Sequence, residues 1–353
     1  MKISILFPTN RGTLLRALRE GLVPDTLLFG TNHLSEHFDV DFLSVNSHIE
    51  EALNRIAVPL TWIFGSKFTR LNLGRALLAL PDLRRSGMII TCVDSMSKAV
   101  LLLKKIHLLN HPVICMAGNV MDGTERLPRA HRWLWSSASR ITTHAQVDQE
   151  KLEHLKLGDL GTMIPVGSDT TFYKASVKKP QRNLIAAIGS DRDRDYETLI
   201  RVARRLPNFK FEIHLSNDQL RYLSKPSNVK FSLDATPTSS RDLLRRAEIV
   251  VIPLKETLRA AGQLALTDAL LMEKPVIISS TRGVVEPYRL KHKNTVFLVR
   301  PRSVDSLLKG IGELHRDSKM RYWIGSNGRQ LALRYTTRKY AKKLRQVINN
   351  VFA

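Results

Sequence analysis

The sequence has little cysteine and no hydrophobic run long enough to span a membrane. Cys92 and Cys115 are its only cysteines. Both lie in apolar stretches, so we expect buried thiols rather than a disulfide. No apolar run approaches the roughly 18 residues of a transmembrane helix, and the N-terminus lacks the organisation of a signal peptide. No group of Cys, His and Asp residues has metal-ligand spacing. These absences predict a cytoplasmic protein without a metal site.

Acidic residues are scarce in the second half of the chain. The whole sequence has 55 basic and 32 acidic residues, a net charge of +23. Residues 1–170 carry a net charge of +3 and residues 171–353 carry +20, and no acidic residue follows Asp317. The asymmetry favours attraction to a polyanion such as anionic lipid, nucleic acid or an acidic polymer over a merely basic soluble surface. No nucleic-acid motif accompanies it, so nucleic acid is not expected as a partner.

One stretch, residues 249–288, predicts a unit of strand, loop, helix and strand. Ile249 to Pro253 and Val276 to Ile278 are β-branched runs typical of strands buried on both faces. Between them, Gly262 opens an apolar segment that has helical spacing. Loops at the carboxyl ends of parallel strands bind ligands. A glycine that enters a helix N-terminus suits an anion, because free N–H groups and the helix dipole point at it.

Strands and helices alternate along the rest of the chain, which predicts doubly wound parallel sheets. Met88–Cys92, Pro112–Met116 and Leu184–Gly189 are predicted strands, the last with a glycine at its end, and Thr26–Phe29 is also read as a strand. A length of 353 residues favours two domains.

Residues 263–286 resemble the nucleotide-sugar segment of retaining GT-B glycosyltransferases, family four (glycosyl transferases group 1). The family pattern is E-G-F-G-x-x-x-x-E-A-M-x-x-G-K-P-V-I-x-S/T-x-x-G-G-x-x-E, and it aligns without gaps on Lys274-Pro275. Asp268 then falls on the second glutamate and Ala260 on the first, so half of the acidic pair is absent. Gly262-Gln263 replaces the phenylalanine and glycine of the pattern.

The resemblance implies an α/β GT-B fold, with two Rossmann-like domains that face each other across a cleft. The expected parts are an acceptor-side domain at 1–170, a linker at 171–182, a nucleotide-sugar domain at 183–330 and a helix at 331–353. That last segment is basic and amphipathic, and we expect it to return to the first domain.

The resemblance also implies a donor site in the second domain. Arg194 occupies the position of the family lysine that holds the donor diphosphate, Ser190 falls on the family arginine, and Arg192 is a substitute cation. A guanidinium suits phosphate because its donors form a planar fork. The alternative is that both arginines pair with the aspartates at 191, 193 and 195. The expected donor-binding residues are Arg194, Arg192, Ser190, Gly262, Gln263, Leu264, Asp268, Ala235 and Thr236.

Further candidates by analogy are Arg11 and Gly12 in the first βα loop, Gly118 after a later strand, and Glu286. For Arg11 and Gly12, an ordinary turn with a surface arginine is an equal alternative. Family members often place a histidine after the strand that ends at Met116, but this chain reads Ala117-Gly118-Asn119 there.

The expected activity is metal-independent transfer of a sugar from a nucleotide-diphosphate sugar, which is a substrate and not a cofactor, with retention of anomeric configuration. The expected acceptor is lipid-linked or polymeric glycan, reached by peripheral, salt-sensitive attachment to the inner face of an anionic membrane. The alternatives are a GT-B-fold nucleotide-sugar epimerase, an inactive nucleotide-sugar scaffold and a polyanion-binding protein.

Overall fold

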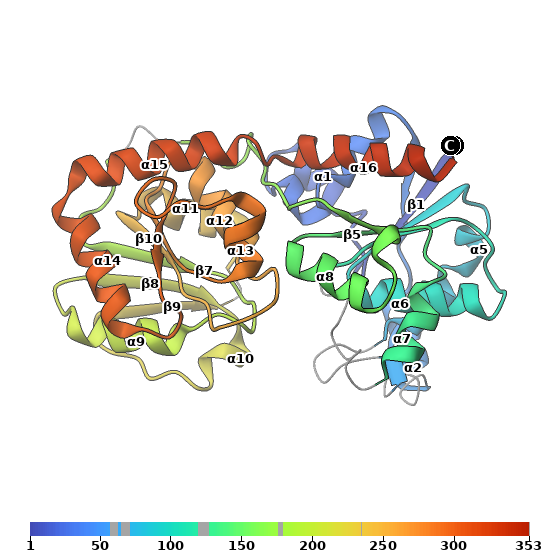
Figure 1. Ribbon diagram of the computed structural model, residues 1–353, viewed down its shortest axis with the longest axis horizontal. Coiled ribbons are helices and arrows are strands. Elements are labelled where there is room, and N and C mark those ends of the chain that lie inside the picture. The colour runs from blue at the N-terminus through green and yellow to red at the C-terminus, as the bar shows by residue number, and fades with distance from the viewer. Residues whose placement is uncertain (57–62, 65–70, 119–126, 176–178, 234, 353) are drawn as a thin grey trace. The chain divides into compact units, whose positions relative to one another are not determined.

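The chain divides into two compact units, each built on its own parallel sheet (Figure 1). The computed structural model describes residues 1–56, 63–64, 71–118, 127–175, 179–233 and 235–352. Unit 1 comprises Met1–Ala17, Gly30–Pro165 and Tyr340–Ala353, and unit 2 comprises Leu18–Phe29 and Val166–Lys339. The expected α/β fold of two doubly wound sheets is confirmed.

Unit 1 contains a six-stranded sheet in the order β2-β1-β3-β4-β5-β6, with every neighbouring pair parallel. Its strands are β1 (Lys2–Leu6), β2 (Asp39–Phe42), β3 (Met88–Cys92), β4 (Val113–Met116), β5 (Arg140–Thr143) and β6 (Gly161–Met163). Its helices are α2 (Ser47–Ile56), α4 (Leu73–Leu78), α5 (Leu80–Leu83), α6 (Asp94–Lys105), α7 (Pro128–Trp135) and α8 (Gln146–His154), with 3-10 turns η2 (Thr31–Glu36) and η3 (Gly158–Leu160). Helix α1 (Leu14–Arg19) runs across the boundary into unit 2.

Unit 2 contains a second six-stranded parallel sheet, in the order β12-β11-β10-β7-β8-β9. Its strands are β7 (Leu184–Ile188), β8 (Lys210–Leu215), β9 (Val229–Leu233), β10 (Ile249–Ile252), β11 (Val276–Ser279) and β12 (Phe297–Val299). Its helices are α9 (Tyr196–Arg205), α10 (Asn217–Leu220), α11 (Pro237–Arg246), α12 (Gln263–Leu271), α13 (Arg282–Tyr288), α14 (Val304–Arg316) and α15 (Ser318–Ala332), with the 3-10 turn η1 (Asp25–Leu28).

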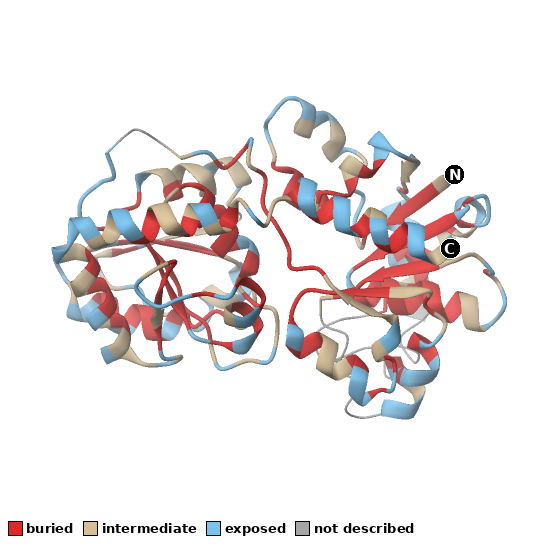
Figure 2. Cartoon of the chain, turned by 45° about the horizontal axis from the view of Figure 1, so that its top comes forward, coloured by how far each residue is buried: buried red, intermediate tan, exposed pale blue. Residues whose placement is uncertain are grey.

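The unit 2 sheet separates two hydrophobic cores, because successive side chains of a strand point to opposite faces. Leu184, Ala186 and Ile188 of β7 pack in one core with α12. Ile185 and Ala187 pack in the other core with α9. Helices α9 and α12 accordingly lie on opposite sides of the sheet, and the central strands β7, β10 and β11 are buried throughout (Figures 1 and 2). Burial on both faces explains the uninterrupted apolar runs of these strands.

The C-terminal helix α16 (Thr337–Phe352) begins in unit 2, and its body belongs to unit 1. Tyr340, Leu344 and Ile348 are buried along one side, whereas Lys342 and Lys343 are exposed. The Tyr340 ring lies 6.2 Å from the ring of His144, at the end of β5. The expected return of an amphipathic helix to the first domain is therefore confirmed. Within the described residues, no helix is both long and apolar enough to cross a membrane.

The two compact units differ from the expected domain bounds at residues 18–29, which join unit 2. The Asp25 N–H donates to the Asp169 carboxylate at 3.0 Å, and the Thr337 hydroxyl donates to the Asp25 carboxylate at 2.9 Å. The strand predicted at Thr26–Phe29 is wrong: Asp25–Leu28 is a 3-10 turn, because these buried long-range bonds replace pairing in a sheet. Unit 2 also contains residues 166–170, which were expected in the first domain, and residues 331–339, which were expected in the C-terminal helix. Residues 176–178 of the expected linker lie outside the described residues.

Candidate functional site

The order of strands in unit 2 identifies a binding edge between β7 and β10. These two strands are neighbours, and the connections from them run to opposite sides of the sheet, so the order reverses between them. In open parallel sheets, ligands bind outside the carboxyl ends of strands at such a switch point. The loops that leave this edge are residues 189–195 after β7 and residues 253–262 after β10.

Arg194 is a buried cation in the first of these loops. It is 6% exposed, and its backbone pairs with Leu254 of the second loop. The guanidinium lies against Gly189, where a Cβ atom would be 2.4 Å from Nη2. Among the described residues, Nε and Nη1 of Arg194 have no hydrogen-bond partner. Burying a charge without a partner is costly, so this geometry suits an anionic ligand that supplies the missing acceptors.

The three aspartates nearest to Arg194 in sequence bind other groups. Arg259 Nη1 lies 2.7 Å from Asp193 Oδ2 and 3.3 Å from Asp191 Oδ1. Asp195 caps α9, because its Oδ1 accepts a hydrogen bond of 3.2 Å from the Thr198 N–H. Among the described residues, these aspartates therefore do not neutralise Arg194, in contrast to the alternative considered from the sequence.

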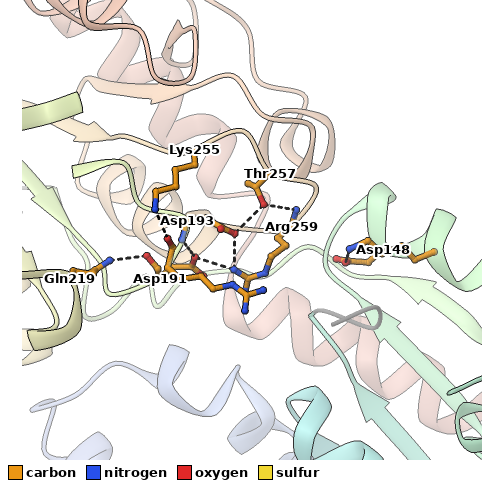
Figure 3. Close-up of polar contacts among 9 residues, drawn as sticks. Asp148, Asp191, Asp193, Gln219, Lys255, Thr257 and Arg259 are labelled. Carbon is orange, nitrogen blue, oxygen red and sulfur yellow. Dashed lines mark hydrogen bonds and ion pairs between the residues drawn. The ribbon is translucent and has the colours of Figure 1, made fainter. Parts of the chain in front are cut away.

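A polar network ties the two loops together (Figure 3). Besides the Arg259 contacts, the Thr257 hydroxyl donates to Asp193 Oδ2 at 3.0 Å, and the Lys255 N–H donates to the Asp193 carbonyl at 2.8 Å. Gln219 Nε2 donates to the Asp191 carbonyl at 2.8 Å. These bonds fix the backbone on the N-terminal side of Arg194, so the network positions its side chain before any ligand arrives.

Arg259 also lies close to α13. A Cβ atom on Gly283 would be 1.9 Å from the Arg259 carbonyl oxygen, so no residue larger than glycine fits without movement of the loop. Sequence reasoning did not select Arg259. The signal that could have found it is a second arginine after the carboxyl end of a predicted strand, at the edge shared with Arg194.

The N-terminus of α12 offers donors at the same edge. The first helical bond runs from the Leu266 N–H to the Gly262 carbonyl, so the helix itself does not use the N–H groups of Leu264 and Ala265. Gly262 has a φ of 82° and supplies no capping side chain. A Cβ atom there would lie 3.4 Å from the Leu254 side chain, whose backbone pairs with Arg194. Leu264 is 37% exposed at this end of the helix.

Asp268 and Gln263 are buried within unit 2 and bonded to protein groups. Ser168 and Tyr173 donate to the Asp268 carboxylate. Burial raises the pKa of Asp268 to about 7, the two hydroxyls lower it, and the neighbouring Asp169 raises it. Gln263 Nε2 donates to the Gly283 carbonyl at 2.8 Å, and its Oε1 accepts from the Tyr288 hydroxyl at 3.2 Å. Their contacts with a donor stay predictions.

The remaining unit 2 candidates are less enclosed. Ser190 is exposed, and Arg192 and Ala235 are partly buried. Thr236 caps α11 by accepting from the Ser239 N–H at 3.1 Å. Glu286 forms an ion pair with Arg282 at 2.7 Å on the outer side of α13.

The unit 1 candidates lie after β1 and β4. The Arg11 guanidinium stacks over the Phe7 ring at 5.1 Å, and partial burial lowers its pKa. Gly12 lies close to Phe42, whose carbonyl oxygen would be 3.3 Å from a Cβ atom. Gly118 lies against the imidazole of His144, and Asn119 lies outside the described residues.

His144 contacts Gly118 from the neighbouring strand. Its Cδ2 would be 3.0 Å from a Cβ atom on Gly118. Nδ1 lies 3.2 Å from the Ile164 carbonyl, and burial lowers the pKa of the imidazole, which keeps it neutral at pH 7. The histidine missing after β4 in sequence therefore has a spatial counterpart after β5. Adjacent parallel strands end at one edge, which is the signal that could have revealed it.

Comparisons with known proteins agree with this architecture. Residues 184–317 match the family model described as glycosyl transferases group 1, which lies within unit 2. A search of curated protein sequences finds no match to this chain.

Solved structures of similar fold cover the whole chain. The chain is similar to sucrose-phosphate synthase from Thermosynechococcus elongatus, with a TM-score of 0.74, 13% identity, and coverage of 100% of this chain and 99% of that one. It is similar to HepE from Anabaena, solved in complex with UDP-glucose, with a TM-score of 0.71, 16% identity and coverage of 99% and 100%. It is also similar to a glycosyltransferase from Rickettsia africae, with a TM-score of 0.70, 13% identity, and coverage of 99% of this chain and 98% of that one. The chain therefore has the GT-B fold.

Proposed function

We propose that this protein is a glycosyltransferase that takes its sugar from a nucleotide-diphosphate donor bound at the carboxyl edge of β7 and β10. The observation that carries the proposal is the buried Arg194 guanidinium at the switch point of unit 2, which has no counter-ion among the described residues. The family match over residues 184–317 supports the same donor domain. A UDP-sugar is the first donor class to test, since the similar HepE was solved with UDP-glucose.

The chemistry that this site supplies is stabilisation of a leaving diphosphate. When the bond between the anomeric carbon and the phosphate oxygen breaks, negative charge develops on the diphosphate. Arg194 and the N–H groups at the start of α12 are fixed donors that meet this charge without reorganisation. We therefore expect transfer without a required divalent ion, and turnover that persists in a chelator tests this.

Asp268 is the proposed partner of the ribose hydroxyls. It would accept their hydrogen bonds as a carboxylate, in exchange for those that Ser168 and Tyr173 donate to it now. Loss of a hydrogen bond to a charged group costs about 1.5–3 kcal/mol, so Asp268→Ala should weaken nucleotide-sugar binding by that amount. Unchanged nucleotide affinity in a folded variant would remove the ribose site from Asp268.

The deciding experiment measures nucleotide release from a panel of nucleotide sugars, with and without glycan acceptors. Acceptor-dependent release together with a new glycoside supports transfer, and the anomeric proton coupling of that product tests retention. Interconversion of the sugars would indicate an epimerase. Binding without turnover would indicate a scaffold. Neither binding nor turnover with any nucleotide sugar would overturn the proposed site.

The proposed acceptor is a lipid-linked or polymeric glycan, handled by a cytoplasmic protein that attaches to the inner face of a membrane. The support is the basic side of α16, where Lys339, Lys342 and Lys343 are exposed. Arg345 also lies there and contacts His37. Each such residue near an anionic bilayer contributes about 1 kcal/mol, within a screening length of roughly 8 Å. Flotation with anionic and neutral vesicles at two salt concentrations tests this attachment. Equal binding to both vesicle types, or none to either, would favour an acidic polymer acceptor.

A further inference from the structure

Helix α15 presents two large aromatic side chains to solvent. Tyr322 is 73% exposed and Trp323 is 54% exposed, whereas the next residue, Ile324, is fully buried. Lys319 lies one turn earlier on the same outward face. A surface depression of about 610 Å³ lies here, lined by Lys293, Asp317, Ser318, Lys319, Met320, Tyr322 and Trp323. We call Lys319, Met320, Tyr322 and Trp323 the aromatic face.

The opposite side of α15 holds the helix in this orientation. A Cβ atom on Gly325 would be 2.5 Å from the Glu273 carbonyl oxygen, and one on Gly328 would be 2.6 Å from Leu270 Cδ2. Both contacts are with the end of α12 and the residues just after it, so the glycines let the two helices pack closely. Because α15 cannot rotate without losing this packing, the aromatic face stays outward.

The charge around the aromatic face is positive. Lys309 in the middle of α14 and Arg316 at its end are exposed, as are Lys319 on α15 and Lys293. The acids in this neighbourhood are Glu313 and Asp317. Glu313 is paired with Lys293 at 2.6 Å. Asp317 accepts from the Met320 N–H at 2.9 Å as the cap of α15. The cations therefore exceed the carboxylates.

We propose that the aromatic face is the surface through which this protein docks on an anionic lipid bilayer. This rests on the membrane attachment proposed above, and it adds a contact in unit 2 to the basic side of α16. Tryptophan and tyrosine combine an apolar ring with a polar group, so they favour the level of the lipid headgroups. The surrounding lysines complement the negative lipid surface, and rigid presentation of the rings lowers the entropy cost of binding.

The first test is vesicle flotation of wild type, the double variant Tyr322→Ala/Trp323→Ala, and the control Tyr222→Ala. Tyr222 is 79% exposed elsewhere on unit 2, so the control matches the size and exposure of Tyr322. With phosphatidylglycerol-containing vesicles, we expect the double variant to partition at least tenfold more weakly than wild type and the control to match wild type. Melting temperatures check that both variants fold as wild type does.

The second test locates the contact by quenching of tryptophan fluorescence with brominated lipids. We expect Trp323→Phe to abolish most of the quenching, because phenylalanine keeps the apolar contact but removes the fluorophore. Trp133→Phe is the matched control, since Trp133 is 46% exposed in unit 1. Quenching that persists in Trp323→Phe, or is lost in Trp133→Phe, would overturn the assignment.

Several outcomes separate this inference from the proposed activity. Wild-type binding by the double variant would place the membrane contact elsewhere, and failure of wild type to bind vesicles would end the docking proposal. Either result leaves turnover with a soluble acceptor unaffected. If the molar mass measured by light scattering is half as large for the double variant as for wild type, a second copy of the chain covers the aromatic face instead. If wild type binds a glycan without vesicles and the double variant does not, the aromatic face binds glycan and not lipid.

Discussion

Replacing Arg194 with methionine should make the ligand-free protein more stable and its donor site weaker. Methionine keeps the packing against Gly189 but removes a charge that is 6% exposed. The guanidinium nitrogens Nε and Nη1 have no partner among the described residues. An unsatisfied buried donor costs about 1–3 kcal/mol. Because about 1 kcal/mol shifts the melting temperature of a unit of this size by about 2–4 °C, we expect a rise of roughly 2–12 °C.

The same substitution should weaken binding of nucleoside diphosphates. Hydrogen bonds to a charged group contribute about 1.5–3 kcal/mol, which corresponds to a loss of about 10- to 150-fold in affinity. Nucleoside monophosphates should lose less if Arg194 contacts the second phosphate. Calorimetric titration with both nucleotide classes, beside thermal unfolding without ligand, measures the two effects in one variant.

Arg192→Met is the matched control in the same loop. Arg192 is only partly buried, so its replacement should change melting temperature and diphosphate affinity little, and turnover should fall less than in Arg194→Met. A less stable Arg194→Met protein with unchanged diphosphate affinity would refute the reasoning, since Arg194 would then be a structural residue. Equal melting temperatures, diphosphate affinities and turnover in the two variants would show that Arg194 has no special role in binding the diphosphate.

Three further predictions concern the surroundings of this site. Arg259→Ala should speed hydrogen exchange of the 191–195 amides in the ligand-free protein and lower the free energy of unfolding by about 1–2 kcal/mol. Unchanged exchange rates would show that the contacts of Arg259 with Asp193 and Asp191 do not order the loop. Gly283→Ala should cost roughly 1–3 kcal/mol by overpacking against the Arg259 carbonyl and reduce turnover, and wild-type stability would contradict the close approach. The pKa of Asp268 is raised to about 7 from an ordinary 3.8, so the native state binds the extra proton between these pH values. The stability of wild type relative to Asp268→Asn should therefore be greatest below pH 3.8 and fall by at most about 1.4 kcal/mol per pH unit up to pH 7, whereas parallel denaturation curves would show that Asp268 does not titrate there.

Local sequence was sufficient for the strands and for the edge at which a ligand would bind. Leu184–Ile188 and Ile249–Ile252 are strands because a parallel sheet covered on both faces needs continuous apolar residues, a property visible in a few consecutive positions. The alternation of helices with these strands then brings their carboxyl ends to one edge. Arg194 and Gly262 could be selected as site candidates on that basis, before any side-chain contact was known.

Hydrogen-bond partners were decided only by the tertiary structure. Three aspartates flank Arg192 and Arg194 in sequence, yet Asp191 and Asp193 bind Arg259, which is 68 and 66 positions away. Asp268 is bonded to Ser168, 100 positions away, so its burial and raised pKa could not be read from an apolar helix. His144 reaches Gly118 from another strand.

The segment Thr26–Phe29 shows the same limit for secondary structure. Its residues favour a strand locally, but Asp25 is bonded to Asp169 and Thr337, and the backbone turns as a 3-10 helix. Local preferences amount to a few tenths of a kcal/mol per residue, whereas a buried hydrogen bond to a charged group contributes about 1.5–3 kcal/mol. Periodicity and residue type therefore determined the two sheets and the ligand edge of this protein. Contacts between residues far apart in sequence decided which cation at that edge lacks a partner within the described part of the chain.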